Sequence, residues 1–295
     1  MGLLLEALKF SGATKKINHK GLNRLGVQCA RTVVARGLHQ FRSPRKIDDE
    51  FSFELREQGC VQIENFLSPT DFESLRKEAF QLMENSEATS THHHGRNTVE
   101  QFSILKESPQ DYPSLYGAIQ NEHLCSLIQV GERRPVNPLL GHRVVERLTQ
   151  QAGTKEDSEA ALHSDIFYHT HKCWLYLEDV TLDQGPLVYV PGSNKYNWVQ
   201  AKHQYIEAND GNRGSRRISK KELDESGLQE RVFTCKANTL VVADTTGYHR
   251  REHGTPGHTR YAIQCSFRTN PFYPSWFDSQ KWLTKRNPLV AKLIS

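Results

Sequence analysis

The sequence predicts a mainly β fold with flanking helices. Residues 172–180 alternate between two chemically different sets of side chains, which is the pattern of a strand with two distinct faces. Residues 231–235 and 239–244 are apolar runs separated by three residues, which predicts a hairpin. Residues 260–268 alternate apolar side chains with mainly small or polar ones. Strands with a polar face of this kind indicate a barrel whose interior is a polar pocket.

Charge divides the chain into two parts. The first 46 residues contain ten Lys and Arg but only one acid, Glu6, which is a net charge of +9. Because the whole chain carries +4, residues 47–295 carry a net charge of −5. We therefore expect a basic N-terminal extension over 1–46 and one domain over 47–295, with the boundary near 44–49. A domain of that size can bury a substantial core.

The basic extension contains a candidate amphipathic helix. Its apolar residues recur at helical spacing, and Arg24, Arg31 and Arg36 lie off that stripe. The stripe consists of Leu22, Leu25, Cys29 and Val33, with Gly26, Ala30 and Val34 alongside. Such a helix either packs on the domain, lies on an anionic membrane surface, or belongs to an organelle transit peptide. A nucleic-acid partner is not favoured, because the basic stretch has no motif of stacking aromatic residues.

The first element that residue patterns predict within the domain is a helix. Ser68, Pro69 and Asp71 supply a cap, a proline at the first helical position and an acid in the first turn. The helix is expected to continue to about Met83. Residues 85–115 are polar and rich in turn formers, which predicts a long loop near the mouth of a site. The run 92–94 of three histidines is expected in this loop, because contiguous histidines cannot all face one metal from a regular element.

Hydropathy and cysteine spacing limit the class of protein. No run approaches the roughly eighteen apolar residues of a membrane-spanning helix, so a soluble, cytoplasmic protein is expected. The six cysteines have no C-x-x-C spacing, which argues against a zinc ribbon or a redox pair and is typical of a reducing compartment. A serine hydrolase is not indicated either, because the chain has no G-x-S-x-G motif.

The one His-x-Asp of the chain, His163 and Asp165, is the candidate metal site. Alternate residues of a strand point to the same face, so the imidazole and the carboxylate can meet at one point. A third ligand is expected from His249, which directly follows a predicted strand, rather than from His253 or His258 in the same loop. Two histidines and one carboxylate leave three positions open, which suits non-haem Fe(II) with O2 and a chelating co-substrate.

Three segments of the chain resemble a known family. The segments HSDIFYHTHKCWLYLEDVTLDQGPLVYVPGSNK and NTLVVADTTGYHRREHGTPGHTRYAIQCSFRTNPF resemble the phytanoyl-CoA dioxygenase family, particularly its bacterial members, within the Fe(II)/2-oxoglutarate oxygenases. The segment LREQGCVQIENFLSPTDFESLRKEAF is similar to the opening strand and helix of that family, so the resemblance spans roughly Phe51 to Tyr273. It implies a double-stranded β-helix, or jelly-roll, with helices packed on one side, over the domain 47–295.

The resemblance also implies roles for individual residues. His163, Asp165 and His249 match the metal ligands of the family. Arg260, eleven positions after His249, matches the arginine that holds the distal carboxylate of 2-oxoglutarate, a task that suits its planar fork. Lys172 matches a lysine of similar bacterial sequences and is a candidate contact of 2-oxoglutarate or substrate, although a solvated strand lysine is an equal alternative.

The expected activity is that of an Fe(II)/2-oxoglutarate-dependent dioxygenase. Such an enzyme converts 2-oxoglutarate and O2 to succinate and CO2 while it hydroxylates an unactivated C–H bond of a small-molecule or lipid-like substrate. Asp165 argues against a halogenase, because its carboxylate fills the position that chloride would need. Two alternatives stay open: a cupin-like enzyme without 2-oxoglutarate, and a binding module on a degenerate barrel. Arg260 argues against the first, since such an enzyme has no dicarboxylate to hold, and the intact set of metal ligands argues against the second. The sequence leaves the substrate and the oligomeric state open.

Overall fold

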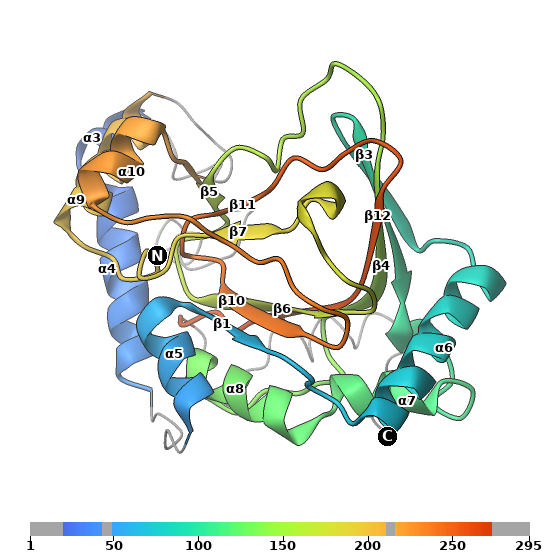
Figure 1. Ribbon diagram of the computed structural model, residues 1–295. Helices are drawn as coiled ribbons and strands as arrows, with labels where there is room; N and C mark the ends of the chain where they lie inside the picture. Colours follow the sequence, from blue (N-terminus) through green and yellow to red (C-terminus); the bar gives the residue numbers. More distant parts are fainter. Residues whose placement is uncertain (1–19, 43–48, 211–215, 273–295) are drawn as a thin grey trace.

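The structure is a computed structural model that describes residues 20–42, 49–210 and 216–272 (Figure 1). The first 19 residues, most of the expected boundary at 44–49 and the last residues of the family resemblance lie outside the described residues.

Two antiparallel sheets face each other, as in the jelly-roll that the sequence predicts (Figure 1). In spatial order, the larger sheet contains β1 (Cys60–Ile63), β10 (Leu240–Asp244), β6 (Thr170–Tyr176), β12 (Thr259–Arg268), β4 (His142–Gln150), β3 (Asn97–Ser103) and β2 (Ser90–His94). The smaller sheet contains β8 (Arg216–Arg217), β5 (His163–Ser164), β11 (His249–Arg251), β7 (Leu187–Tyr189) and β9 (Arg231–Val232).

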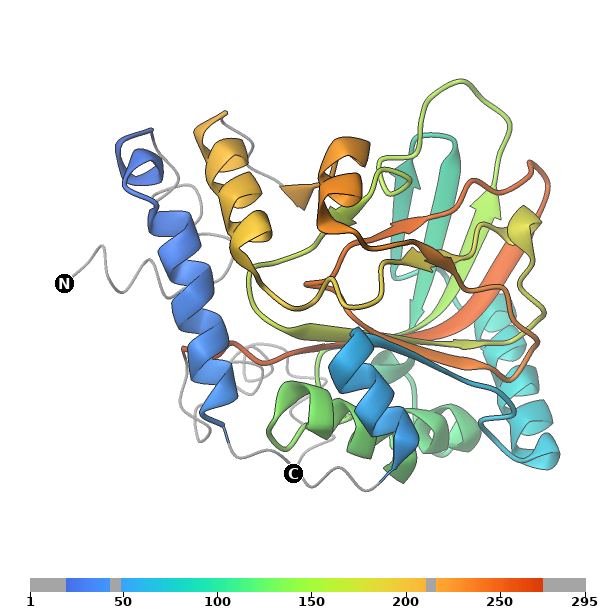
Figure 2. The same cartoon turned by 60° about the vertical axis from the view of Figure 1, so that its left-hand side comes forward.

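Helices cover the outer face of the larger sheet and one end of the sandwich (Figures 1 and 2). The outer face is covered by α5 (Glu50–Gln58), α6 (Pro69–Asn85), α7 (Pro113–Ile119) and α8 (Glu122–Glu132). The end is covered by α3 (Lys20–Arg24), α4 (Val27–Gln40), α9 (Trp198–Asn209) and α10 (Lys220–Ser226). Two short 3-10 turns, η1 (Ile104–Lys106) and η2 (Leu182–Gln184), complete the elements of the described residues. None of the described helices is long and apolar enough to cross a membrane.

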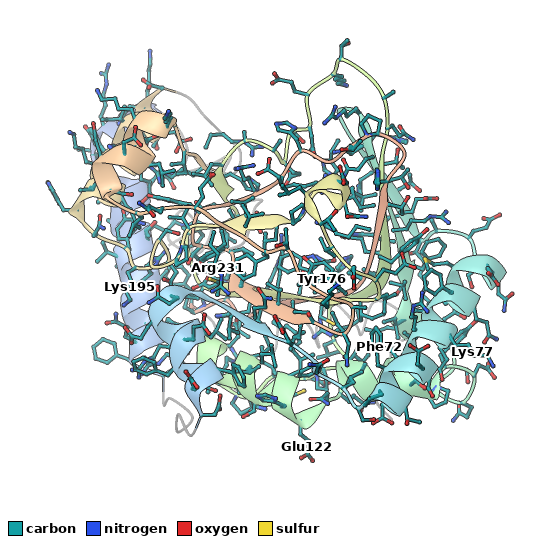
Figure 3. All side chains as sticks on the ribbon, in the orientation of Figure 1. Phe72, Lys77, Glu122, Tyr176, Lys195 and Arg231 are labelled. Carbon is teal, nitrogen blue, oxygen red and sulfur yellow. The ribbon has the colours of Figure 1, made fainter. Side chains whose placement is uncertain are left out.

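Alternate side chains of a strand in the larger sheet point either to the helices on its outer face or to the space between the two sheets. Cys173 and Leu175 of β6 pack in the main core with the helices. Trp174 and Tyr176, which alternate with them, pack in a second cluster with residues of the smaller sheet, and Tyr176 lies between the sheets (Figure 3). The two-faced strand expected over 172–180 is therefore confirmed, although β6 itself ends at Tyr176. The expected strand at 260–268 is confirmed as β12.

The hairpin expected over 231–244 is wrong. β9 pairs with β7 in the smaller sheet, whereas β10 pairs with β1 and β6 in the larger one. Between them, Phe233 is fully buried in the cluster between the sheets, and Asn238 takes a positive φ of 63°. The chain thus crosses from one sheet to the other where a turn was expected. An apolar run predicts a strand but carries no information on which neighbour it pairs with.

The long loop expected over 85–115 is also wrong. β2 and β3 form a hairpin at the edge of the larger sheet, and the three histidines at 92–94 lie on β2. The sequence of these two strands lacks the usual alternation of apolar and polar residues, for two reasons. β2 is an edge strand that is largely exposed, so it needs no apolar face. β3 directs Asn97 and Gln101 inward, so its buried face is partly polar.

The expected capped helix is confirmed as α6. It begins at Pro69 and ends at Asn85, and the Ser68 side chain accepts a hydrogen bond from the Asp71 N–H at 3.2 Å. Phe72, Leu75 and Ala79 lie on its buried face, so the helix is held by packing on the core as well as by its cap.

The N-terminal helix exists, but it packs largely through a face other than the expected one. Leu25 and Val33 of the predicted stripe are 79% and 57% exposed, whereas Arg31 and Ala35 are buried. Val34, Leu38 and Phe41 are exposed as well. Apolar spacing therefore located the helix but not its contact face.

Polar contacts explain why that face is buried. The Thr32 hydroxyl accepts a hydrogen bond from Gln204 on α9, and the Arg31 guanidinium lies 3.8 Å from the centroid of the Phe167 ring. Burial lowers the pKa of Arg31 to about 10, and the nearby charge of Tyr168 opposes that shift. The polar side chains of Arg31 and Thr32 thus pack against the rest of the protein.

Asp244, at the end of β10, is a buried carboxylate with every oxygen in use. One oxygen lies 2.5 Å from His169 Nδ1, and the other accepts hydrogen bonds from the N–H and hydroxyl of Thr246. Burial would raise the pKa of Asp244, but the charge and hydrogen bond of His169 outweigh it and hold that pKa far below its usual range. The folded state therefore favours the ionised carboxylate.

We expect Asp244→Asn to lower stability at pH 7 by about 3–5 kcal/mol, because it breaks a buried charged pair. The folded-state pKa lies below the unfolded value, so this contribution is present above about pH 5 and is lost as the pH falls further. Urea unfolding at pH 7, 4 and 3 measures both effects. The difference between wild type and variant should shrink as the pH falls; two parallel curves would contradict the assignment.

Candidate metal centre

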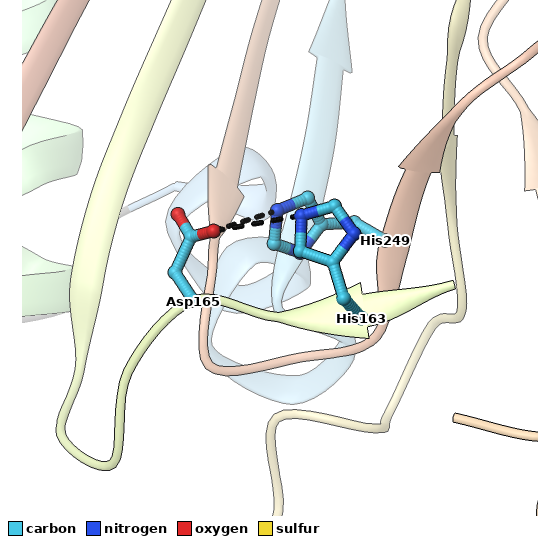
Figure 4. A group of neighbouring side chains, drawn as sticks. All are labelled: His163, Asp165 and His249. Atoms are coloured by element: carbon cyan, nitrogen blue, oxygen red, sulfur yellow. Dashed lines mark ion pairs between the residues drawn. The ribbon is translucent and has the colours of Figure 1, made fainter. Parts of the chain in front are cut away.

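His163, Asp165 and His249 come together at one end of the smaller sheet (Figure 4). His163 on β5 and His249 on β11 are direct partners across the antiparallel pair, and their ring centroids lie 4.4 Å apart. Asp165 follows β5, and its N–H donates to the Thr245 carbonyl at 2.9 Å. One ligand atom from each of the three residues falls within 4.8 Å of the others, which is close enough to share one ion.

The hydrogen bonds of the two histidines prepare the correct nitrogen for a metal. His163 Nδ1 lies 2.8 Å from the Ala161 carbonyl, and His249 Nδ1 lies 3.0 Å from the Gly247 carbonyl. A carbonyl can only accept, so each Nδ1 carries the hydrogen. The Nε2 atoms lie 3.6 Å and 3.5 Å from Asp165 Oδ1, so these are the nitrogens that a shared metal would bind. Backbone carbonyls commonly orient metal-binding imidazoles in this way.

Asp165 is held in the anionic form that a metal ligand needs. The Nζ of Lys172, on β6, lies 2.6 Å from Asp165 Oδ2. Burial would raise the pKa of Asp165, but the charges of Lys172 and His249 hold it well below its usual range. Lys172 is thus not a solvated strand lysine, because its ammonium contacts the central carboxylate of the site.

Glu159 is a member of the site that sequence reasoning missed. Its carboxylate lies 3.3 Å from His163 Nε2, the nitrogen that faces Asp165. The hydrogen bond from His163 lowers the pKa of Glu159 to about 2 against the opposing effect of burial. The only sequence signal is an acid four positions before the first ligand. A metal ion bound to this nitrogen would have to displace Glu159 from His163.

Arg260 is buried at the start of β12, on the face that also carries Gln264 and Ser266. One guanidinium nitrogen donates to the Gly185 carbonyl at 2.5 Å, and another lies 3.6 Å from the carboxylate of Glu146. Its buried Nε has no acceptor among the described residues. Arg260 therefore keeps donor capacity inside the sandwich, and Glu146 is a second residue that sequence reasoning missed.

A cavity of about 370 Å³ adjoins the metal-binding residues. Lys172 connects the two, because it lines the cavity and also contacts Asp165. The buried Gln264 Oε1 has no hydrogen-bond partner among the described residues. The other lining side chains are mostly polar: Gln101, His142, Ser266 and Arg268, together with Gly141. The alternative ligand His253 is exposed in the loop after β11, and His258 is not part of the metal-binding group.

Comparison with known families matches residues 55–239 to the family described as phytanoyl-CoA dioxygenase (PhyH). The match covers more than half of the chain and ends before His249 and Arg260, so only the structure joins His249 to His163 and Asp165. No curated protein matches the chain.

Several solved structures are similar to this chain. The epimerase SnoN in complex with Fe3+, alpha ketoglutarate and nogalamycin RO is 13% identical, with a TM-score of 0.49 over 75% of this chain and 85% of that one. HygX from Streptomyces hygroscopicus, with nickel, 2-oxoglutarate and hygromycin B bound, is 13% identical, with a TM-score of 0.48 over 75% and 87%. EctD from S. alaskensis, with 2-oxoglutarate and 5-hydroxyectoine, is 17% identical, with a TM-score of 0.49 over 78% and 83%. At such low identities the family match carries the assignment.

We expect anaerobic Fe(II) to raise the thermal midpoint of the wild type. At a free metal concentration 100 times Kd the gain is about 2.7 kcal/mol, which corresponds to roughly 5–10 °C. His249→Ala should abolish the shift, because it removes one of the three ligands. His253→Ala is the matched control and should keep it. A shift that survives His249→Ala but is lost in His253→Ala would place the third ligand elsewhere.

Proposed function

The chain belongs to the phytanoyl-CoA dioxygenase family, and on this premise we propose that it is a non-haem Fe(II)- and 2-oxoglutarate-dependent oxygenase. The observation that carries the proposal is the meeting of His163, Asp165 and His249, with both Nε2 atoms turned toward one carboxylate oxygen. Two imidazoles and one carboxylate are the donor set of non-haem Fe(II) oxygenases, and they leave open positions on the metal.

The residues present fit the metal and its co-substrate. Fe(II) on these three ligands would supply the activation of O2, coupled to the oxidation of 2-oxoglutarate to succinate and CO2. Arg260 would pair with the distal carboxylate of 2-oxoglutarate, since its guanidinium retains a buried donor without a partner. Glu146 stands beside Arg260 and balances part of its charge when no dicarboxylate is present.

Lys172 would have two roles, one toward Asp165 and one toward the adjoining cavity. It balances the charge of Asp165, which keeps that carboxylate ionised and turned toward the two histidines. It also lines the adjoining cavity, where its ammonium is available to a polar group of a substrate. The barrel interior next to it is filled by buried side chains such as Trp174 and Ala243.

We propose that the substrate is a small polar molecule whose C–H bond is hydroxylated. The supporting observation is the cavity beside Asp165, whose lining is mainly polar and includes an amide oxygen without a partner on Gln264. This favours the small-molecule alternative over a lipid-like one, because an acyl chain would leave these buried groups without hydrogen bonds. Asp165 favours hydroxylation over halogenation, because its carboxylate occupies the position of a halide.

We expect Arg260→Leu to raise the KM for 2-oxoglutarate roughly 10–100-fold, the loss expected when charge-assisted hydrogen bonds to a carboxylate are removed. The measurement is succinate formation against 2-oxoglutarate concentration, with Fe(II) present. Arg76→Leu, on the exposed side of α6, is the matched control and should leave KM unchanged.

The same experiment distinguishes the proposed oxygenase from a cupin-like enzyme without 2-oxoglutarate and from a binding module. Turnover that is independent of both 2-oxoglutarate and Arg260 would favour a cupin-like enzyme. A wild type that binds Fe(II) but forms no succinate with a broad set of polar substrates would favour a binding module. Thermal midpoints of all variants show whether a loss of turnover reflects unfolding.

A further inference from the structure

A second cavity, of about 520 Å³, lies outside the sandwich. Its lining residues come from α4, α5, the end of α8, residues 194–196 and the ends of β6 and β10; Figure 2 shows how the helices are arranged there. It shares no lining residue with the cavity beside Asp165. The two cavities lie on opposite faces of β6, because His171 lines the outer one and its neighbour Lys172 lines the inner one. Its size is that of a small-molecule site.

The outer cavity is strongly cationic. Among the described residues that line it, four carry a fixed positive charge: Arg36, Arg56, Arg133 and Lys195. The single lining acid is Asp244, and its oxygens already bind His169 and Thr246. Arg56 and Lys195 at the rim share the carboxylate of Glu57. Among the described lining residues, Asp244 is therefore the only acid that offsets the charge of the two remaining arginines.

Arg36 is the first of these two arginines. One of its terminal nitrogens donates to the Asn194 carbonyl, and its guanidinium lies over the ring of Tyr196. Its buried Nε has no acceptor, and it forms no ion pair within the described part of the chain. Burial lowers the pKa of Arg36, although the nearby charge of Asp244 opposes that shift. A buried guanidinium in this state gains most from an anion.

Arg133 is the second. It lies directly after α8 with a positive φ of 54°, a left-handed conformation that directs the chain away from the helix axis. Its Nε is also buried without a hydrogen-bond partner among the described residues. Two arginines from different parts of the chain thus line one cavity, and each has an Nε without a hydrogen-bond partner among the described residues. A guanidinium is a planar fork that suits oxyanion groups.

We propose that the outer cavity is a binding site for a small polyanion, whose phosphate or carboxylate oxygens pair with Arg36 and Arg133. The ligand is larger than a single oxyanion, since the volume far exceeds that of one such group. The site is independent of the proposed oxygenase activity, because none of its residues belongs to the metal centre or the inner cavity.

Binding is tested directly by calorimetry on the full chain, without metal, with inorganic pyrophosphate and citrate as probes. The wild type should bind at least one probe with one site per chain. Arg36→Gln and Arg133→Gln should each weaken binding at least tenfold. Because these residues lie on different elements, a folding defect in one variant leaves the other informative. Lys77→Gln, which removes an exposed charge from α6, is the matched control and should bind as the wild type does (Figure 3).

A gain of a competing charge provides the complementary test. A Cβ atom at Gly37, which lines the cavity on α4, would meet no atom within 4 Å. Gly37→Glu should therefore fold, place a carboxylate near Arg36, and weaken probe binding at least tenfold. Preference for pyrophosphate or for citrate distinguishes a phosphate ligand from a carboxylate one.

Three results would overturn the proposal. The first is a wild type that binds neither probe. The second is equal affinity in all variants, which would mean an adventitious ion only. The third is binding that survives Arg36→Gln and Arg133→Gln but is lost in Arg268→Gln, which would place the anion in the inner cavity.

Discussion

The antiparallel pairing of β5 with β11 is the constraint on which the metal centre depends. It sets His163 opposite His249, and backbone carbonyls two residues before each histidine orient the two rings alike. β5 is only two residues long, so the pair cannot be stable by itself. It is held by β7 and β8 on either side and by the bond from the Asp165 N–H to Thr245. The site is therefore a product of the whole sandwich.

The two faces of the larger sheet have different roles: the outer face forms the core, and the inner face carries the polar side chains of the site. Its outer face buries apolar side chains under α5, α6, α7 and α8, which supplies the main hydrophobic core. Its inner face carries Lys172, Gln264, Arg260 and Glu146, which are polar and still largely buried. Burying so many polar groups is costly unless they are satisfied, and two of their atoms, Gln264 Oε1 and Arg260 Nε, lack partners within the described chain. This cost is acceptable at a site that receives a polar ligand.

The N-terminal helix α4 is held to the rest of the protein by other kinds of contact than the core. It joins the body through Thr32, Arg31 and His39 rather than through its apolar residues. Burial, with the neighbouring charge of His169, lowers the pKa of His39 to about 2, so its ring packs against His169 in the neutral form. Such polar contacts fix orientation, because each has one geometry, whereas apolar contacts tolerate sliding. The same packing of α4 on the body leaves Arg36 in the lining of the outer cavity.

By itself the sequence determined the local features: the cap of α6, the alternation of β6 and β12, and the residue types of the metal centre. These follow from nearest-neighbour geometry, which a linear pattern records. Only the tertiary structure decided that β9 and β10 lie in different sheets, that residues 90–103 form an edge hairpin, and that α4 packs through its polar face. Only it brought Glu159 to His163 and Glu146 to Arg260. The reason is physical: pairing partners and burial are set by contacts between residues far apart in the chain, and no local pattern encodes them.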